Sequence, residues 1–183
     1  MYDQRPRPER VRISKLQEAQ IAELVRIDRA AAEQYHALGF DAAEVPWRGE
    51  GDFYLLPKDY AVRVAEADHH VAGYTAYRDE PPGVVYIEEL TVDPAQQRLG
   101  IGTALLERLL EESRELGLEH VVLRTWTKAV WARSFYARHG FAPIHRAAPE
   151  KVRAWVADKR GSGRPFDREG LDILWRSTEP LTK

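Results

Sequence analysis

The chain of 183 residues is 44% hydrophobic and 31% charged, and 27 Lys and Arg against 29 Asp and Glu give a formal net charge of -2. This composition argues against intrinsic disorder, and the lack of a basic surplus argues against a general nucleic-acid binder. The count of 0 cysteines excludes disulfide scaffolds, thiolate zinc sites and a cysteine nucleophile.

The N-terminal segment is rich in proline and charge. We expect residues 1–9 to form a flexible leader and residues 10–183 to form a single domain. No apolar segment has the length of a signal core or a membrane span. We therefore expect a cytoplasmic protein.

The first half of the chain shows strand-type and helix-type spacing of apolar residues in turn. The expected elements are a strand over 11–16, a helix from 17 to about 38 that ends at Gly39, a loop over 40–58, strands over 60–65 and 71–77 joined by a turn, and a strand over 84–92. The last strand is apolar on both faces apart from Glu88 and Glu89, as in a central strand covered on both sides.

In the second half, strands and helices alternate more regularly. We expect a helix that follows the segment 97–103 and is closed by Gly117, a strand over 120–126, a helix over 128–138 capped by Gly140, a strand over 141–144, a helix over 149–159 and a strand over 171–175. This order favours parallel pairing of 84–92 with 120–126 through a right-handed crossover, and pairing of the last strand with 141–144. The fold class is therefore α/β with a mixed sheet.

A glycine loop, Gly100-Ile101-Gly102, follows a strand and opens a helix, where backbone N–H groups and the helix dipole favour a phosphate. A Walker loop is excluded because Thr103 and Ala104 follow instead of a Lys-Ser/Thr pair. A dinucleotide fingerprint is disfavoured because Leu105 occupies the position of its third small residue.

Two motifs in the sequence fit a different kind of site. In the first, Gln97, Gly100 and Gly102 match Gln/Arg-x-x-Gly-x-Gly, and Leu90-Thr91-Val92-Asp93-Pro94 precedes them. The second lies downstream in Phe135-Tyr136-Ala137-Arg138-His139-Gly140-Phe141, where a Tyr is followed by three residues and then by Gly-Phe. At these residues, and over roughly 73–144, the sequence resembles the GNAT superfamily of N-acetyltransferases.

The resemblance implies a central mixed sheet with flanking helices, in which the strand over 84–92 splays from the strand over 120–126. It also implies acetyl-CoA as the acyl donor, with the pantetheine arm hydrogen-bonded along the splayed strand as an added strand would be. The residues expected to bind it are Leu90, Thr91 and Val92 for pantetheine, and Gln97, Arg98, Leu99, Gly100, Ile101, Gly102 and Thr103 for pyrophosphate.

Acetyl transfer to an amine needs a base for the ammonium proton, a polarised thioester carbonyl and a proton donor for the thiolate. Glu88 or Glu89 is the expected base, backbone N–H groups near 90–92 serve as oxyanion donors, and the resemblance makes Tyr136 the proton donor. Neighbouring strand residues point to opposite faces, so only one carboxylate faces the acceptor unless a bulge intervenes. The resemblance slightly favours Glu88, because in relatives with a similar strand the first carboxylate often acts as the base. The alternatives are carboxylates that pair with arginine or face solvent, and a tyrosine that only packs the core.

One departure from the family pattern is Ala129, where many relatives have an Asn. Thr127 and Lys128 are nearby substitutes, although helix capping is the favoured role of Thr127. The histidines show no metal-ligand spacing, so no metal is expected. The acidic and aromatic loop over 40–56 either holds a cationic acceptor or is a solvated loop.

These observations predict an acyltransferase that moves acetyl from acetyl-CoA directly to a primary amine, most simply of a small molecule. The alternatives are a protein lysine or N-terminal acetyltransferase and a non-catalytic acetyl-CoA-binding sensor. We expect no nucleic-acid or membrane partner, and analogy with the family suggests a homodimer.

Overall fold

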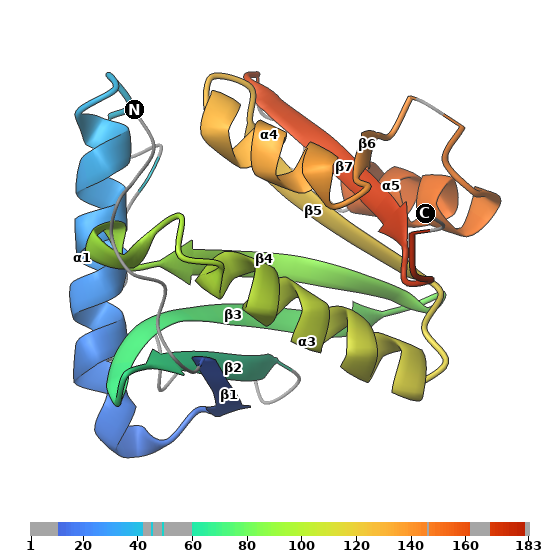
Figure 1. Cartoon of the computed structure of the whole chain (residues 1–183). Helices are drawn as coiled ribbons and strands as arrows, with labels where there is room; N and C mark the ends of the chain where they lie inside the picture. The colour runs from blue at the N-terminus through green and yellow to red at the C-terminus, as the bar shows by residue number, and fades with distance from the viewer. Residues whose placement is uncertain are drawn as a thin grey trace. The chain divides into compact units, whose positions relative to one another are not determined.

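The computed structural model describes residues 11–41, 45, 49, 60–145, 147–161 and 169–181. The predicted leader, residues 1–9, and most of the loop expected over 40–58 lie outside these residues. The elements are β1 (Val11–Lys15), a 3-10 helix (Glu18–Gln20), α1 (Ile21–His36), β2 (Ala61–Ala67), β3 (His70–Glu80), β4 (Val84–Val92), a 3-10 helix (Pro94–Gln96), α3 (Ile101–Glu115), β5 (His120–Trp126), α4 (Val130–Arg138), β6 (Ala142–Pro143), α5 (Glu150–Gly161) and β7 (Leu171–Ser177) (Figure 1). No helix in the described part of the chain combines the length and apolarity that a membrane span requires.

The strands form a seven-stranded sheet in the order β1-β2-β3-β4-β5-β7-β6. β4 and β5 are parallel, whereas β1 with β2, β2 with β3, β5 with β7 and β6 with β7 are antiparallel. The predicted mixed sheet and its parallel pair are thus confirmed. The expected pairing of the last strand with the strand near 141–144 is also confirmed, but β7 has β5 as a second partner, which was not predicted.

The parallel pairing of β4 with β5 is short. Its register runs from Val84 opposite His120 to Ile87 opposite Leu123, while β4 itself continues to Val92. In the described residues, the last five positions of β4 have no registered partner on β5. This end of the ladder lies where the sequence predicts the splayed strand pair.

The contacts of the chain group into two compact units, residues up to 77 with 89–109, and 78–88 with the residues from 110 onward. β3, β4 and α3 contribute residues to both.

In the first unit, α1 packs one face of the β2–β3 hairpin. Its Ile21 and Leu24, three residues apart, contact Val62, Val64 and Tyr74. A second cluster packs Ile101 and Leu105 of α3 with residues that include Ala65, Ala67, Ala72, Leu90 and Val92. These two clusters form the core of the unit.

The hairpin turn is tighter than predicted. Five residues, 66–70, were expected to separate the strands, but only Asp68 and His69 do so, with φ of 48° and 69°. Positive φ at both central residues is typical of a type I′ turn, whose twist matches that of the flanking strands, so pairing continues to the turn.

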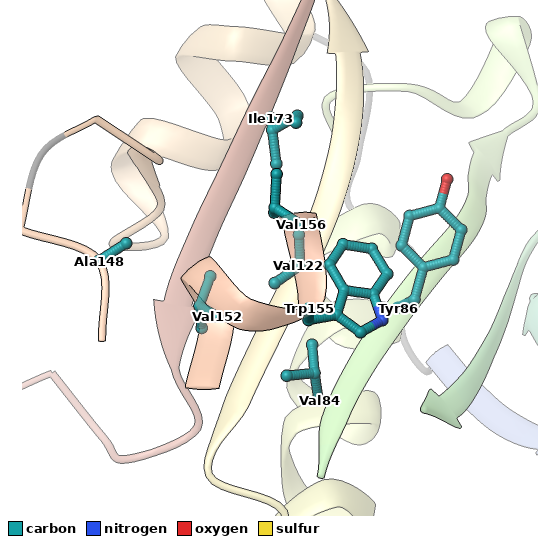
Figure 2. Packing of buried hydrophobic residues seen from close by; sticks show 8 residues of the cluster. All are labelled: Val84, Tyr86, Val122, Ala148, Val152, Trp155, Val156 and Ile173. Atoms are coloured by element: carbon teal, nitrogen blue, oxygen red, sulfur yellow. The ribbon is translucent and has the colours of Figure 1, made fainter. Parts of the chain in front are cut away.

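In the second unit, α5 covers one face of β4, β5 and β7. Trp155, 1% exposed, lies at the centre of a cluster formed by Val84, Tyr86, Val122, Ala148, Val152, Trp155, Val156 and Ile173 (Figure 2). The rings of Tyr86 and Trp155 are 5.4 Å apart. α5 therefore closes this part of the core.

Two helix starts differ from the prediction. The segment Glu18–Gln20 forms a 3-10 turn with a capping box from Gln17, so α1 begins at Ile21. α4 begins after Ala129, and the Thr127 hydroxyl instead donates to the carbonyl of Gly170 at 3.0 Å. The expected capping role of Thr127 is therefore wrong.

Candidate active site

The loop between β4 and α3 has the backbone shape of an anion site. Arg98 and Gly100 have φ of 68° and 90°, and α3 begins at Ile101 with a bond from Ala104 N to Gly100 O at 3.0 Å. Left-handed residues in a turn direct neighbouring N–H groups to one side, and the following helix adds the positive end of its dipole. The left-handed conformation at position 100 is one that glycine adopts without strain.

Gln97, the first residue of the loop motif, ties the loop to its surroundings. Its Nε2 donates to Gln34 Oε1 at 3.0 Å and to Val92 O at 3.3 Å. The side chain thereby joins α1, the end of β4 and the loop. In this arrangement Gln97 shapes the loop through its side chain.

A second tie joins α1 to the same loop. Arg26 Nη2 lies 2.6 Å from Asp93 Oδ2, and Asp93 Oδ1 accepts from Ala95 N at 2.9 Å. Asp93 is buried, so dissolved salt screens this ion pair less than it would screen an exposed one. Sequence reasoning missed both Arg26 and Gln34, because their partners lie more than 60 residues away in the chain.

The end of β4 approaches β3 closely. A Cβ on Gly73 would lie 2.5 Å from Thr91 O and 3.0 Å from the Cα of Val92. The Thr75 hydroxyl donates to the carbonyl of Glu89 at 2.8 Å. Only a residue without a side chain fits between these backbones.

The side chains of β4 alternate between the two faces of the strand at this end. Leu90 and Val92 pack in the cluster with α3. The Thr91 hydroxyl donates a hydrogen bond to Glu89 Oε1 at 2.8 Å. Burial, followed by the negative charge of Glu89, raises the pKa of Tyr35 in α1 to about 12. Glu89 thus belongs to the first unit, together with the loop.

Glu88 belongs to the second unit and to the Tyr86 side of the strand. Burial, followed by the charge of Glu88, raises the pKa of Tyr86 to about 12, against the opposing effect of Arg124. Arg124 Nε donates to the Tyr86 hydroxyl at 2.9 Å. The two carboxylates thus have different neighbours, as strand alternation predicts.

Tyr136 lies at the end of α4 and is 8% exposed. Its ring meets Phe141 edge to face at 5.3 Å, and its carbonyl accepts from the N–H groups of His139 and Phe141 at 3.0 Å each. Arg176 Nη1 donates to His139 O at 2.7 Å and holds the helix end. The residues of the second sequence motif thus form one helix terminus.

The structure brings Leu90, Thr91, Val92, Glu89 and the Gln97–Thr103 loop into the first unit, and Glu88 and Tyr136 into the second. The candidate acceptor loop, 40–56, is largely outside the described residues. Within the described ranges, no three or more His, Asp or Glu side chains are grouped as metal ligands would be.

Comparison with known proteins agrees with this geometry. The sequence model of the Acetyltransferase (GNAT) family matches residues 21–141, and the chain belongs to this family. The family prediction is therefore confirmed.

Curated relatives match over part of their length. The amino-acid acetyltransferase of Mycobacterium tuberculosis is 41% identical over 58 residues, which is 32% of this chain and 30% of the relative. The mycothiol acetyltransferase of Nocardia farcinica is 29% identical over 128 residues, 68% of this chain and 42% of the relative. The chain thus spans less than half the length of either relative.

Solved structures share the fold at low identity. A GNAT-family acetyltransferase from Staphylococcus aureus has a TM-score of 0.69 at 18% identity, over 93% of this chain and 100% of that one. The PaiA N-acetyltransferase of Thermoplasma acidophilum, solved with coenzyme A, has a TM-score of 0.69 at 15% identity, over 92% of this chain and 99% of that one. The GNAT fold predicted from the sequence is confirmed.

Proposed function

We propose that the protein is an acetyl-CoA-dependent N-acetyltransferase that transfers acetyl directly to a primary amine of a small molecule. The observation that carries this proposal is the glycine loop at the start of α3, which follows a strand end without a registered partner on β5. Two relatives named for amino-acid and mycothiol acetylation support a small-molecule acceptor.

Acetyl-CoA fits the residues of the first unit as a donor substrate. Backbone groups of Leu90 to Val92 are suited to hydrogen bonds with the amides of pantetheine, in the manner of an added strand. The N–H groups from Gln97 to Thr103 and the dipole of α3 are suited to the pyrophosphate, and Arg98 adds a positive charge. Bound acetyl-CoA supplies an activated thioester.

The proposed reaction forms a bond between the acceptor nitrogen and the acetyl carbon and breaks the bond between that carbon and sulfur. The ammonium proton goes to Glu88 or Glu89, and Tyr136 returns a proton to the thiolate. Backbone N–H groups near Leu90 to Val92 stabilise the developing oxyanion. No covalent enzyme intermediate is needed.

The test is thiol release from acetyl-CoA, read with a thiol reagent in the presence of amino acids, polyamines, aminoglycosides or peptides. The protein has 0 cysteines and adds no background. We expect amine-dependent release. Peptides as the only active acceptors would favour protein acetylation, and acetyl-CoA binding without release for any amine would favour a sensor.

Three variants rank the catalytic residues. Tyr136→Phe should lower kcat with acetyl-CoA affinity retained, because only the proton donor is lost. Glu88→Gln and Glu89→Gln should differ. The substitution that removes the base should lower kcat by about 10²- to 10⁴-fold, on the order expected for general-base catalysis, and should abolish the acid limb of the pH–rate profile. Wild-type activity in all three variants would contradict these roles.

A cytoplasmic location and a homodimer are part of the proposal. The dimer is tested by sedimentation equilibrium and the location by fractionation of cells that express the chain. A monomer at micromolar concentration would contradict the dimer.

A further inference from the structure

A buried arginine lies beside the helix end that carries Tyr136. Arg176 is the sixth residue of β7 and is 6% exposed, although its side chain carries a positive charge. Burial, followed by the charge of Arg114, lowers the pKa of this guanidinium, because the charged form is desolvated. A charge in such a place is stable only where its N–H groups have hydrogen-bond partners.

Strand alternation directs Arg176 to the side of β7 that faces α4. Ile173, three residues earlier, packs on the opposite side, in the cluster around Trp155. Asp172, four residues before Arg176, binds Arg133 of α4 with Oδ2 to Nε at 2.9 Å. Arg176 therefore shares with Asp172 the side of the strand that α4 covers (Figure 1).

The guanidinium bonds to three backbone carbonyls. Nη1 donates to His139 O at 2.7 Å, Nη2 to Glu179 O at 2.6 Å and Nε to Ser177 O at 2.5 Å. His139 caps the C-terminus of α4, where carbonyl oxygens lack partners within the helix and the helix dipole is negative. Arg176 thus satisfies one of these carbonyls and complements the dipole.

Two residues that Arg176 contacts also contact Tyr136. The N–H groups of His139 and Phe141 both donate to the Tyr136 carbonyl at 3.0 Å, and the Phe141 ring lies 5.3 Å from the Tyr136 ring. Arg176 Cζ in turn lies 5.9 Å from the centre of the Phe141 ring. Arg176 is therefore linked to both the backbone and the ring of Tyr136.

The chain that follows β7 covers the same helix end. Gly140 has φ of 82°, and a Cβ at this position would lie 2.6 Å from Leu181 Cδ2. The bond from Arg176 Nη2 to the Glu179 carbonyl fixes the segment that leads to Leu181. The end of α4 is thus held by β7 and by the residues after it, and Arg176 bonds to both.

We infer that Arg176 is a positioning residue for Tyr136. It holds the end of α4 against β7, so that the Tyr136 hydroxyl keeps the orientation in which it returns a proton to the thiolate. The inference rests on the proposed function, in which Tyr136 is the proton donor. Proton transfer requires hydrogen-bond distance between the two heavy atoms, so a small displacement of the tyrosine lowers the rate.

A double-mutant cycle on kcat tests this role. Arg176→Gln should lower kcat about 10- to 100-fold in the protein that has Tyr136, because a misplacement of about 1 Å has an effect of up to this order. In the Tyr136→Phe background the same change should alter kcat less than about twofold, because the group that Arg176 positions is already lost. The KM values should stay within about threefold of wild type.

Further variants separate positioning from folding. Arg176→Lys keeps the charge but not the fork, so it should lose less kcat than Arg176→Gln, again only where Tyr136 is present. If Arg176→Gln does not fold, Arg176→Lys carries the cycle. Arg153→Gln is the matched control, because Arg153 of α5 also donates to a backbone carbonyl, that of Ala148. It should leave kcat unchanged in both backgrounds, and all assays are run below the Tm of each variant.

The outcomes are distinguishable. Equal fold-losses of kcat in the two backgrounds would overturn the inference, because Arg176 would then act on the fold and not through Tyr136. Wild-type kcat in the Arg176 variants, or in Tyr136→Phe, would also overturn it and leave the proposed acetyl transfer standing. Absence of thiol release by the wild-type protein with every amine would overturn both.

Discussion

Gly73→Ala is expected to weaken both the first unit and its binding of acetyl-CoA. At an unobstructed strand position, a Gly→Ala change stabilises the folded protein by about 0.4–1 kcal/mol, because it lowers the conformational entropy of the unfolded chain. Here the new carbon would lie 2.5 Å from Thr91 O, 0.9 Å inside the ordinary contact limit of 3.4 Å. The obstacle is backbone, so the strands must shift.

The cost of such overpacking is about 1–3 kcal/mol, so after the gain is subtracted the net loss is centred on about 1 kcal/mol and reaches at most about 2.6 kcal/mol. For a chain of this size, each kcal/mol lost lowers Tm by roughly 2–4 °C. Because the shift moves Leu90 to Val92, the Kd for acetyl-CoA should rise several-fold.

Differential scanning fluorimetry gives Tm, and calorimetry gives the Kd. Gly161→Ala is the matched control, because its new Cβ would meet nothing within 4 Å and its residue ends a helix. It should be neutral or slightly stabilising. Equal stability and affinity of Gly73→Ala and the wild-type protein would refute the close approach of β3 to β4.

Two other changes test the two units separately. Glu80→Gln should destabilise by about 2–4 kcal/mol in denaturant unfolding, because it removes a buried carboxylate from Arg78 and Lys159. Burial raises the pKa of Glu80, but hydrogen bonds from Lys159 and Trp155 and the nearby Arg78 outweigh it and leave the pKa below 4.5. The wild-type advantage over Glu80→Gln should therefore be complete above pH 4.5 and disappear as the pH falls through the folded pKa; a pH-independent difference would contradict this. Gln34→Ala should raise the Kd for acetyl-CoA about two- to tenfold in calorimetry with little change in Tm, because one hydrogen bond to Gln97 is lost.

The central strands were predictable to the residue. Val84–Val92 and His120–Trp126 have the predicted bounds, because each is an apolar run between strong turn residues. The ends of helices were less predictable. The start of α1 depends on a capping interaction between Gln17 and Gln20 that apolar spacing does not reveal.

The candidate site was predictable where it depends on local backbone chemistry. The motif identified the glycine loop, and strand alternation separated Glu88 from Glu89. The ties from Gln34 and Arg26 and the Tyr86–Arg124 bond were not predictable, because they join residues 38 to 67 positions apart. Such partners depend on which elements the fold brings side by side.

The position of β7 bears on how this family is cut into fragments for expression. The family match ends at residue 141, yet all seven residues of β5 are paired with β7, which begins at Leu171. A fragment trimmed to the match would leave β5 with an open edge of unpaired backbone groups and would also remove Trp155 from the core. Open edges recruit other chains, so such a fragment should aggregate even though it retains both sequence motifs.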